Sequence, residues 1–181
     1  MNPEFYDEQF ETRALTPATW ALTGQRLRRS ADIVMAGYNS DLKTMESGAS
    51  PLELRNLELS GCATLLYGLA LENLLKAIII KTDPAVIIDG ELRRWPAGGH
   101  DLLILCNVAK IKTTKVEKDL LARLTSFVRW AGRYPIPNAA SNMRLAQSSV
   151  DPDFIPLPFN PHELPASDAL YARLESQVTQ T

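Results

Sequence analysis

The sequence predicts an all-α protein: an up-and-down bundle of four to five helices, followed by an extended proline-rich strap and a terminal helix. Apolar residues recur at steps of three and four along several long segments, which is the spacing of one helix face. The stretch Cys62–Lys81 is apolar on nearly all sides, as expected of a helix surrounded by neighbours. Seven of the twelve prolines lie between residues 134 and 165, so an extended strap is expected there.

Capping residues and helix breakers set the predicted boundaries. The predicted helices span residues 17–45, 51–82, 101–111, 116–131 and 166–179. The first starts where Thr16 precedes a proline, and the second starts at Ser50-Pro51 and stops before Pro84. Asp101 is the expected N-cap of the third helix, and Ser167 and Asp168 are the expected caps of the last. We therefore predict one domain over 1–181, with its core at about 17–133 and the strap at 134–165.

Composition and charge limit the cellular compartment and the partners that we expect for the protein. A formal net charge of −2 gives no global basic field, so any nucleic-acid contact has to come from a local patch. Cys62 and Cys106 lie in apolar helical patterns and form neither a disulfide framework nor a metal-ligand spacing, which favours a reducing cytoplasm. No secretory signal is visible, and polar residues interrupt the longest apolar stretch. We therefore expect a cytoplasmic protein that needs no membrane, metal or cofactor.

The polar interruption of the second helix consists of Glu72, Asn73 and Lys76. Glu72 and Lys76 are four residues apart, in the order that favours an ion pair on a helix. Charges in such apolar surroundings need partners, because unpaired burial is costly. Two interpretations follow: a structural ion pair shared with an arginine of the first helix, or a charged patch at the edge of a cleft.

His100 is one of two histidines and stands at the entry to the third helix, after two glycines. Arg93 and Arg94 precede it by seven and six residues. An imidazole that moves a proton and a guanidinium that stabilises a phosphorane suit metal-independent cleavage of RNA. The alternative is that His100 and Asp101 cap the helix.

Basic and aromatic residues are mixed at the end of the fourth helix, in Arg129, Trp130, Arg133 and Tyr134. Basic residues there favour the helix dipole, which explains one or two of them. The mixture also suits stacking on a nucleotide or on a single strand of RNA.

Three segments together resemble the HEPN family (higher eukaryotes and prokaryotes nucleotide-binding domain): YGLALENLLKAIIIKTDP, GHDLLILC and RWAGRYPIP. The family has an Ala-x-Glu-x-x-x-Lys-Ala helix before a His-x-Leu helix, matched here by Ala70, Glu72, Lys76 and Ala77 and then by His100 and Leu102. The resemblance covers roughly residues 20–135. It implies a bundle of four to five helices, frequently a homodimer. The residues that we expect to contact a nucleotide or RNA are Lys76, Arg93, Arg129, Arg133 and Tyr134.

Many HEPN members resemble ribonucleases of bacterial toxin–antitoxin or phage-defence systems, with an antitoxin or a nucleotidyltransferase as partner. Their Arg-x(4–6)-His signature is matched by Arg94 and His100. The match precedes the third predicted helix, whereas the family's signature usually falls near the start of the last core helix. We therefore rank nucleotide or RNA binding above cleavage. A non-enzymatic helical adaptor, docking a protein through the proline-rich strap, is the third hypothesis.

Overall fold

The computed structural model describes residues 3–48, 55–83, 87–88, 91–92, 95–137, 139 and 163–179. Its elements are α1 (Pro3–Leu15), α2 (Pro17–Glu46), η2 (Leu57–Leu59), α3 (Ser60–Thr82), β1 (Ile87–Ile88), β2 (Glu91–Leu92), η3 (Pro96–Gly99), α4 (Leu102–Val108), α5 (Lys115–Ser126), η4 (Phe127–Ala131) and α6 (Leu164–Thr179). The prediction of an all-α bundle is confirmed.

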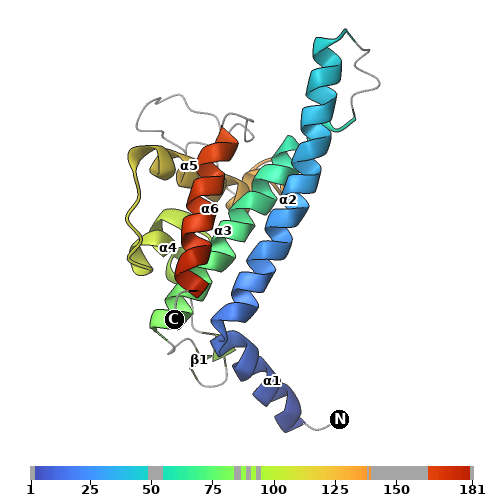
Figure 1. Cartoon of the computed structure of the whole chain (residues 1–181). Helices are drawn as coiled ribbons and strands as arrows, with labels where there is room; N and C mark the ends of the chain where they lie inside the picture. The colour runs from blue at the N-terminus through green and yellow to red at the C-terminus, as the bar shows by residue number, and fades with distance from the viewer. Residues whose placement is uncertain are drawn as a thin grey trace.

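Helix α3 is the centre of the bundle (Figure 1). It packs along α2 and also contacts α4, α5, η4 and α6. A continuous run of its residues, Leu74 to Ile80, is buried, charged Lys76 included. The stretch Leu57–Thr82 is long and apolar enough to cross a membrane, but 78% of its most apolar window is buried inside the bundle. It is therefore the core helix of the fold.

The long helix α2 begins and ends as predicted. Thr16 has an extended backbone and Pro17 occupies the first helical turn, where its missing N–H costs no hydrogen bond. Helix α1 precedes it and leaves the foot of α2 at an angle (Figure 1). The sequence interpretation contained no helix at residues 3–15. In the structure Phe5 and Tyr6 are both about half exposed, so the aromatic residues of α1 do not form a buried stripe.

The predicted start of the second helix at Ser50-Pro51 is wrong. Arg55 and Asn56 are not helical, and a single 3₁₀ turn at η2 precedes α3 at Ser60. The carboxylate of Asp41 on α2 accepts from the backbone N–H of Asn56 at 2.6 Å and from its side chain at 3.0 Å. These bonds hold the chain in a turn beside α2, so the helix starts later. The predicted stop is correct, since Asp83 is the C-cap.

The short connections hold two further features. Strands β1 and β2 pair in antiparallel register, with Ile87 opposite Leu92, where the sequence interpretation had only a connection. Asp101 caps α4 as predicted, and Thr114 with Glu117 forms a capping box at the start of α5.

The last helix, α6, starts earlier than its predicted caps. It begins at Leu164, after Glu163 forms an ion pair with Arg123 of α5. Ser167 therefore lies buried within the helix, and Asp168 pairs with Arg28 of α2. The predicted strap lies outside the described residues from 140 to 162, as does His162 within it.

Candidate functional site

The predicted ion pair of α3 is present and buried. The ammonium of Lys76 donates to Glu72 Oε1 at 2.7 Å, and the two residues are only 6% and 4% exposed. Their four-residue spacing places both side chains on one helix face, one turn apart. The carboxylate and the ammonium thus neutralise each other inside the bundle.

The second oxygen of the carboxylate joins α3 to the start of α4. Glu72 Oε2 lies 3.0 Å from Nδ1 of His100. The expected third partner, an arginine of the first helix, is therefore replaced by this histidine. His100 does not cap α4 either: the Asp101 carboxylate accepts from the N–H of Ile104 at 3.0 Å.

Two tryptophans cover this pair of charges. The rings of Trp20, from α2, and Trp95, which precedes η3, meet edge to face with centroids 5.7 Å apart. The Lys76 ammonium lies 5.3 Å from the Trp95 centroid and 5.8 Å from that of Trp20, at cation–π distance. Sequence reasoning missed both tryptophans as site residues. The available signal was their rarity, three in 181 residues, and the position of Trp95 five residues before His100.

Gly99 makes this packing possible. Its φ is +77°, and a Cβ there would lie 2.8 Å from Cβ of Trp95 and 3.2 Å from the Lys76 ammonium. Glycine is therefore needed both for the backbone conformation and for the space. We call Glu72, Lys76, His100, Trp20 and Trp95 the Glu72 cluster.

The chemistry of the Glu72 cluster centres on the histidine. The side chain of His100 is 42% exposed, whereas that of Glu72 is 5% exposed. In neutral imidazole the carboxylate selects the tautomer with the proton on Nδ1. The outer edge of the ring then presents Nε2 as an acceptor. A carboxylate that orients an imidazole in this way is the usual arrangement for proton transfer.

The end of α5 comes close to the same place. The N–H of Leu102 donates to Thr125 Oγ1 at 3.0 Å, which fixes the start of α4 to α5. One turn further on, Arg129 Nη1 lies 3.9 Å from Oδ2 of Asp101, the residue after His100. The structure therefore brings together the entry of α4 and the predicted basic–aromatic end of the fourth helix.

That basic–aromatic end is partly exposed. The chain turns there through the π-helix η4, a form that recurs at functional sites. Arg133 donates to the carbonyl of Arg129 at 2.8 Å and lies 5.6 Å from the ring centroid of Tyr134, which is 54% exposed.

One proposed nucleotide contact, Lys76, lies away from this surface, and another lies outside the described residues. Lys76 is enclosed in the Glu72 cluster, so its ammonium does not lie beside the arginines at the surface. Arg93 and Arg94 lie outside the described residues, so the pairing of Arg94 with His100 stays a prediction.

A second charged cluster joins α2, α3 and α6, and sequence reasoning did not find it. Arg28 pairs with Asp32 at 2.9 Å and with Asp168 at 2.5 Å, and the hydroxyl of Tyr67 donates to Asp32 at 2.8 Å. The guanidinium lies 5.0 Å from the ring centroid of Tyr67 and 5.1 Å from that of Tyr171. We call these five residues the Arg28 cluster.

Burial shifts the ionisation of the Arg28 cluster. Burial and the hydrogen bond to Asp32 raise the pKa of Tyr67 well above its usual range. Burial, with Glu175 nearby, raises the pKa of Tyr171 to about 12. Burial opposes the charge of Arg28, but Asp32 and Asp168 outweigh it and raise the pKa of the guanidinium. At neutral pH both phenols are therefore neutral and Arg28 is charged.

The described residues offer little for nucleophilic or metal chemistry. Burial raises the pKa of the Cys106 thiol to about 12, so it is no nucleophile at neutral pH. Cys62 is exposed. Among the described residues, no group of three His, Cys, Asp or Glu side chains is placed to hold a metal ion.

Comparisons with known proteins add no assignment. No family model matches the chain, and neither the curated proteins nor the solved structures contain a match.

Proposed function

We propose that this chain is a HEPN-like nucleotide- or RNA-binding domain that contacts a single-stranded RNA segment where α4 begins and η4 ends. The proposal rests on one observation: the 3.9 Å approach of Arg129 to Asp101 brings the basic–aromatic end of the bundle beside His100. His100 and the basic–aromatic end of the bundle, which the sequence indicated independently, are thus neighbours at one edge of the molecule.

The chemistry of this edge suits RNA. Arg129 and Arg133 supply positive charge for phosphates, and the exposed ring of Tyr134 offers a surface on which a base stacks. The contact between Arg129 and Asp101 is long and only partly buried, so a phosphate can compete for the guanidinium. Lys76 has no direct role in this proposal, because it neutralises Glu72.

A second candidate function, metal-independent ribonuclease, is favoured by the bond between Glu72 and His100. The carboxylate orients the imidazole through Nδ1, so Nε2 is the nitrogen that would take the proton of a ribose 2′-hydroxyl. Arg94 is the proposed group for the scissile phosphate. On the HEPN resemblance, the proposed partner is an antitoxin or a nucleotidyltransferase of a toxin–antitoxin or phage-defence system, acting in the cytoplasm.

The binding proposal is tested with fluorescently labelled single-stranded RNA, by anisotropy over a series of salt concentrations. We expect Arg129→Ala/Arg133→Ala to weaken binding at least tenfold and to lower the slope of log K against log salt by ~0.7 per lost phosphate contact. The matched control is Lys112→Ala/Lys115→Ala, which removes two exposed charges at the other end of the α4–α5 hairpin. Equal loss in both variants, or no binding by the wild type, contradicts the proposal.

The cleavage proposal needs a separate readout. Purified wild type, His100→Ala and Glu72→Gln are compared for cleavage of the same RNA in the presence of EDTA. Cleavage that disappears in His100→Ala and is reduced in Glu72→Gln supports the ribonuclease. Binding without cleavage in all three leaves the RNA-binding proposal standing and excludes this one.

A further inference from the structure

A groove of about 530 Å³ lies in the angle where α1 leaves the foot of α2 (Figure 1). Strand β1 packs against α1, and Leu92 of the paired strand β2 lines the groove. Asn73 of α3 lines it as well. The volume is typical of a site for one small molecule. Among the described residues, the lining shares none with the edge that we propose to bind RNA.

Three aromatic rings line this groove. Tyr6 and Phe10 are four residues apart on one face of α1, and Trp20 comes from α2. Tyr6 and Phe10 are 51% and 38% exposed, and exposed aromatic rings gathered around a hollow are typical of a binding surface. The N–H of Trp20 already donates to the carbonyl of Ala14 at 3.1 Å, so its ring offers only apolar surface. We call this hollow, with its three rings, the aromatic groove.

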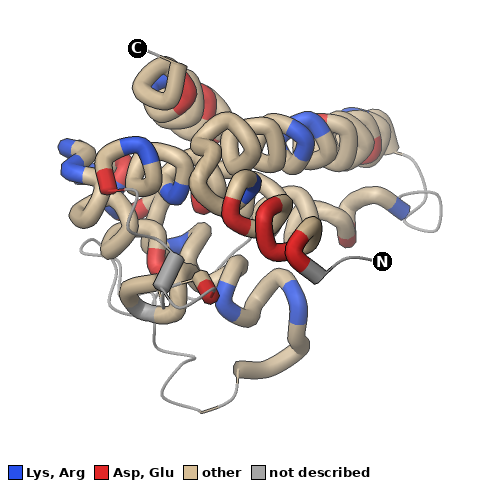
Figure 2. Tube along the Cα trace, turned by 90° about the horizontal axis from the view of Figure 1, so that it is seen from below, with Lys and Arg blue, Asp and Glu red and all other residues tan. Residues whose placement is uncertain are grey.

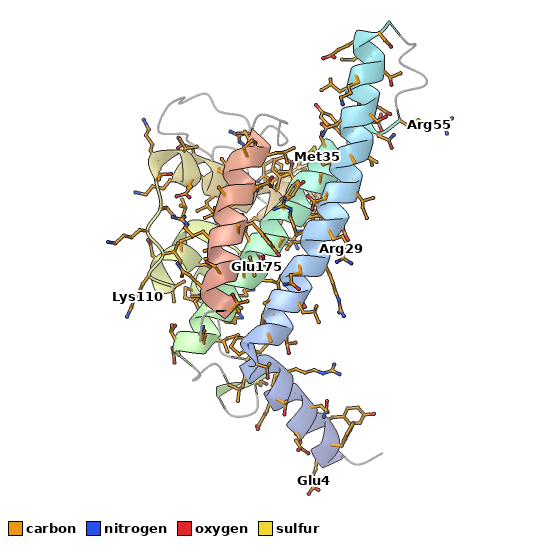
Figure 3. The ribbon with its side chains drawn as sticks, in the orientation of Figure 1. Glu4, Arg29, Met35, Arg55, Lys110 and Glu175 are labelled. Atoms are coloured by element: carbon orange, nitrogen blue, oxygen red, sulfur yellow. The ribbon has the colours of Figure 1, made fainter. Side chains whose placement is uncertain are left out.

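Arg13 gives the aromatic groove a positive charge. It is the one charged residue among the described residues of the lining, it is exposed, and it forms no ion pair within the part of the chain that the structure describes. The acidic residues Glu4, Asp7, Glu8 and Glu11 follow the opposite side of α1, because a helix turns once in 3.6 residues. Figure 2 shows these acidic bands along α1, and Glu4 points away from the bundle in Figure 3. The groove face of α1 therefore suits an anion.

Neutral polar groups accompany the charge. Gln9 precedes Arg13 by four residues on the same face, so an amide N–H and a guanidinium N–H can bind the two oxygens of one carboxylate. The Thr23 hydroxyl and the Asn73 amide each donate to a carbonyl one turn earlier in their own helix, at 3.1 Å and 2.8 Å, and each keeps an oxygen that accepts. Asn73 belongs to the polar interruption of α3 but not to the Glu72 cluster, and the aromatic groove gives it a role.

We propose that the aromatic groove binds a small, flat aromatic carboxylic acid. The carboxylate lies on Gln9 and Arg13, and the ring system lies between the rings of α1 and that of Trp20. A single cation matches the single charge of such an acid, whereas a nucleotide brings a polar sugar and a doubly charged phosphate into a mostly apolar hollow. The proposal goes beyond RNA binding and is tested without RNA.

The test is isothermal titration calorimetry of the full chain with 2-naphthoate as the probe. We expect a Kd on the order of 1 mM or tighter, as is usual for a ligand of this size. Arg13→Gln should weaken binding about fivefold, and so should replacing the probe with its neutral carboxamide. The two losses should not add, because both remove the same charge pair. Thr23→Phe places a ring in the groove and should abolish binding.

The matched control is Arg29→Gln, which removes one exposed charge of α2 that projects away from α3 and α6 (Figure 3) and should bind like the wild type. Circular dichroism confirms the folding of each variant, since all three substituted residues are exposed. Absence of binding to the wild type at tenfold higher probe concentration overturns the proposal. So does equal binding of the carboxamide, or unchanged binding in Arg13→Gln or Thr23→Phe. Tighter binding of decanoate, a flexible acid, or of adenosine monophosphate overturns it in favour of that class of ligand.

Discussion

Two charged clusters lie against α3, and they differ in whether the cluster includes a histidine that reaches the surface. The Arg28 cluster ties α2, α3 and α6 together, with its guanidinium between two carboxylates and two aromatic rings. The Glu72 cluster also joins several elements, but its last member is a half-exposed histidine with one ring edge turned away from the carboxylate. The first arrangement serves packing, whereas the second leaves a titratable group at the surface.

The largest loss of stability is expected for a substitution in the buried ion pair of the Glu72 cluster. Lys76→Met leaves a buried carboxylate with the histidine as its only remaining partner among the described residues, and should lower the free energy of unfolding by about 3–5 kcal/mol. Urea denaturation of the single variant and of Glu72→Gln/Lys76→Met measures it. The double variant should recover most of the loss, because no unpaired charge stays buried. A double variant as unstable as the single one would contradict the ion-pair interpretation.

The Arg28 cluster should respond less. Its carboxylates are about half exposed, so Arg28→Met should cost about 1–2 kcal/mol. Because the guanidinium holds α6 through Asp168, hydrogen exchange should quicken in α6 before it quickens in α3. Equal protection of α6 in the variant and the wild type would show that apolar packing alone retains the helix.

Alkaline pH tests the same cluster through its phenols. The folded pKa of Tyr171 is about 12, and the folded pKa of Tyr67 is well above its usual range. In the unfolded chain both phenols have a pKa of about 10. The stability that the two neutral phenols contribute to the folded state is therefore fully present below pH ~10 and is lost as the pH rises through the folded pKa values. Absorbance at 295 nm should show these two tyrosines ionising together with unfolding. Tyr67→Phe should remove part of this pH dependence.

The smallest effect is expected at His100. Its side chain is 42% exposed and Lys76 still neutralises Glu72 without it, so His100→Ala should change the free energy of unfolding by less than ~1 kcal/mol. If RNA binding or cleavage falls while stability holds, the histidine serves function. A stability loss as large as that of Lys76→Met would make it structural instead.

The sequence predicted local features far better than contacts between distant segments. The start of α2 at Pro17, the end of α3 at Asp83 and the cap at Asp101 each depend on a proline or a capping side chain nearby. The late start of α3 depends on Asp41, fifteen residues before Asn56. The Asp-Gly pair between β1 and β2 was a hairpin signal that the interpretation left unused.

In the candidate site, too, contacts within one helix were predictable from the sequence and contacts between distant segments were not. The bond between Lys76 and Glu72 follows from a spacing of four residues along one helix. The bond between Glu72 and His100 spans 28 residues and depends on how the chain between them folds back. The Arg28–Asp168 pair spans 140 residues, so only the packing of α6 reveals it.

Gly99 has a consequence for how relatives of this chain would be recognised. Any side chain at this position has to displace Trp95 or the Lys76 ammonium. A chain that keeps the site while drifting elsewhere is therefore constrained at a few separated points: a glutamate and a lysine one helical turn apart, and, after a connection of variable length, a glycine directly before a histidine. Substitutions elsewhere on the helices leave this sparse pattern intact, so we expect the pattern to persist in any relative that keeps the site.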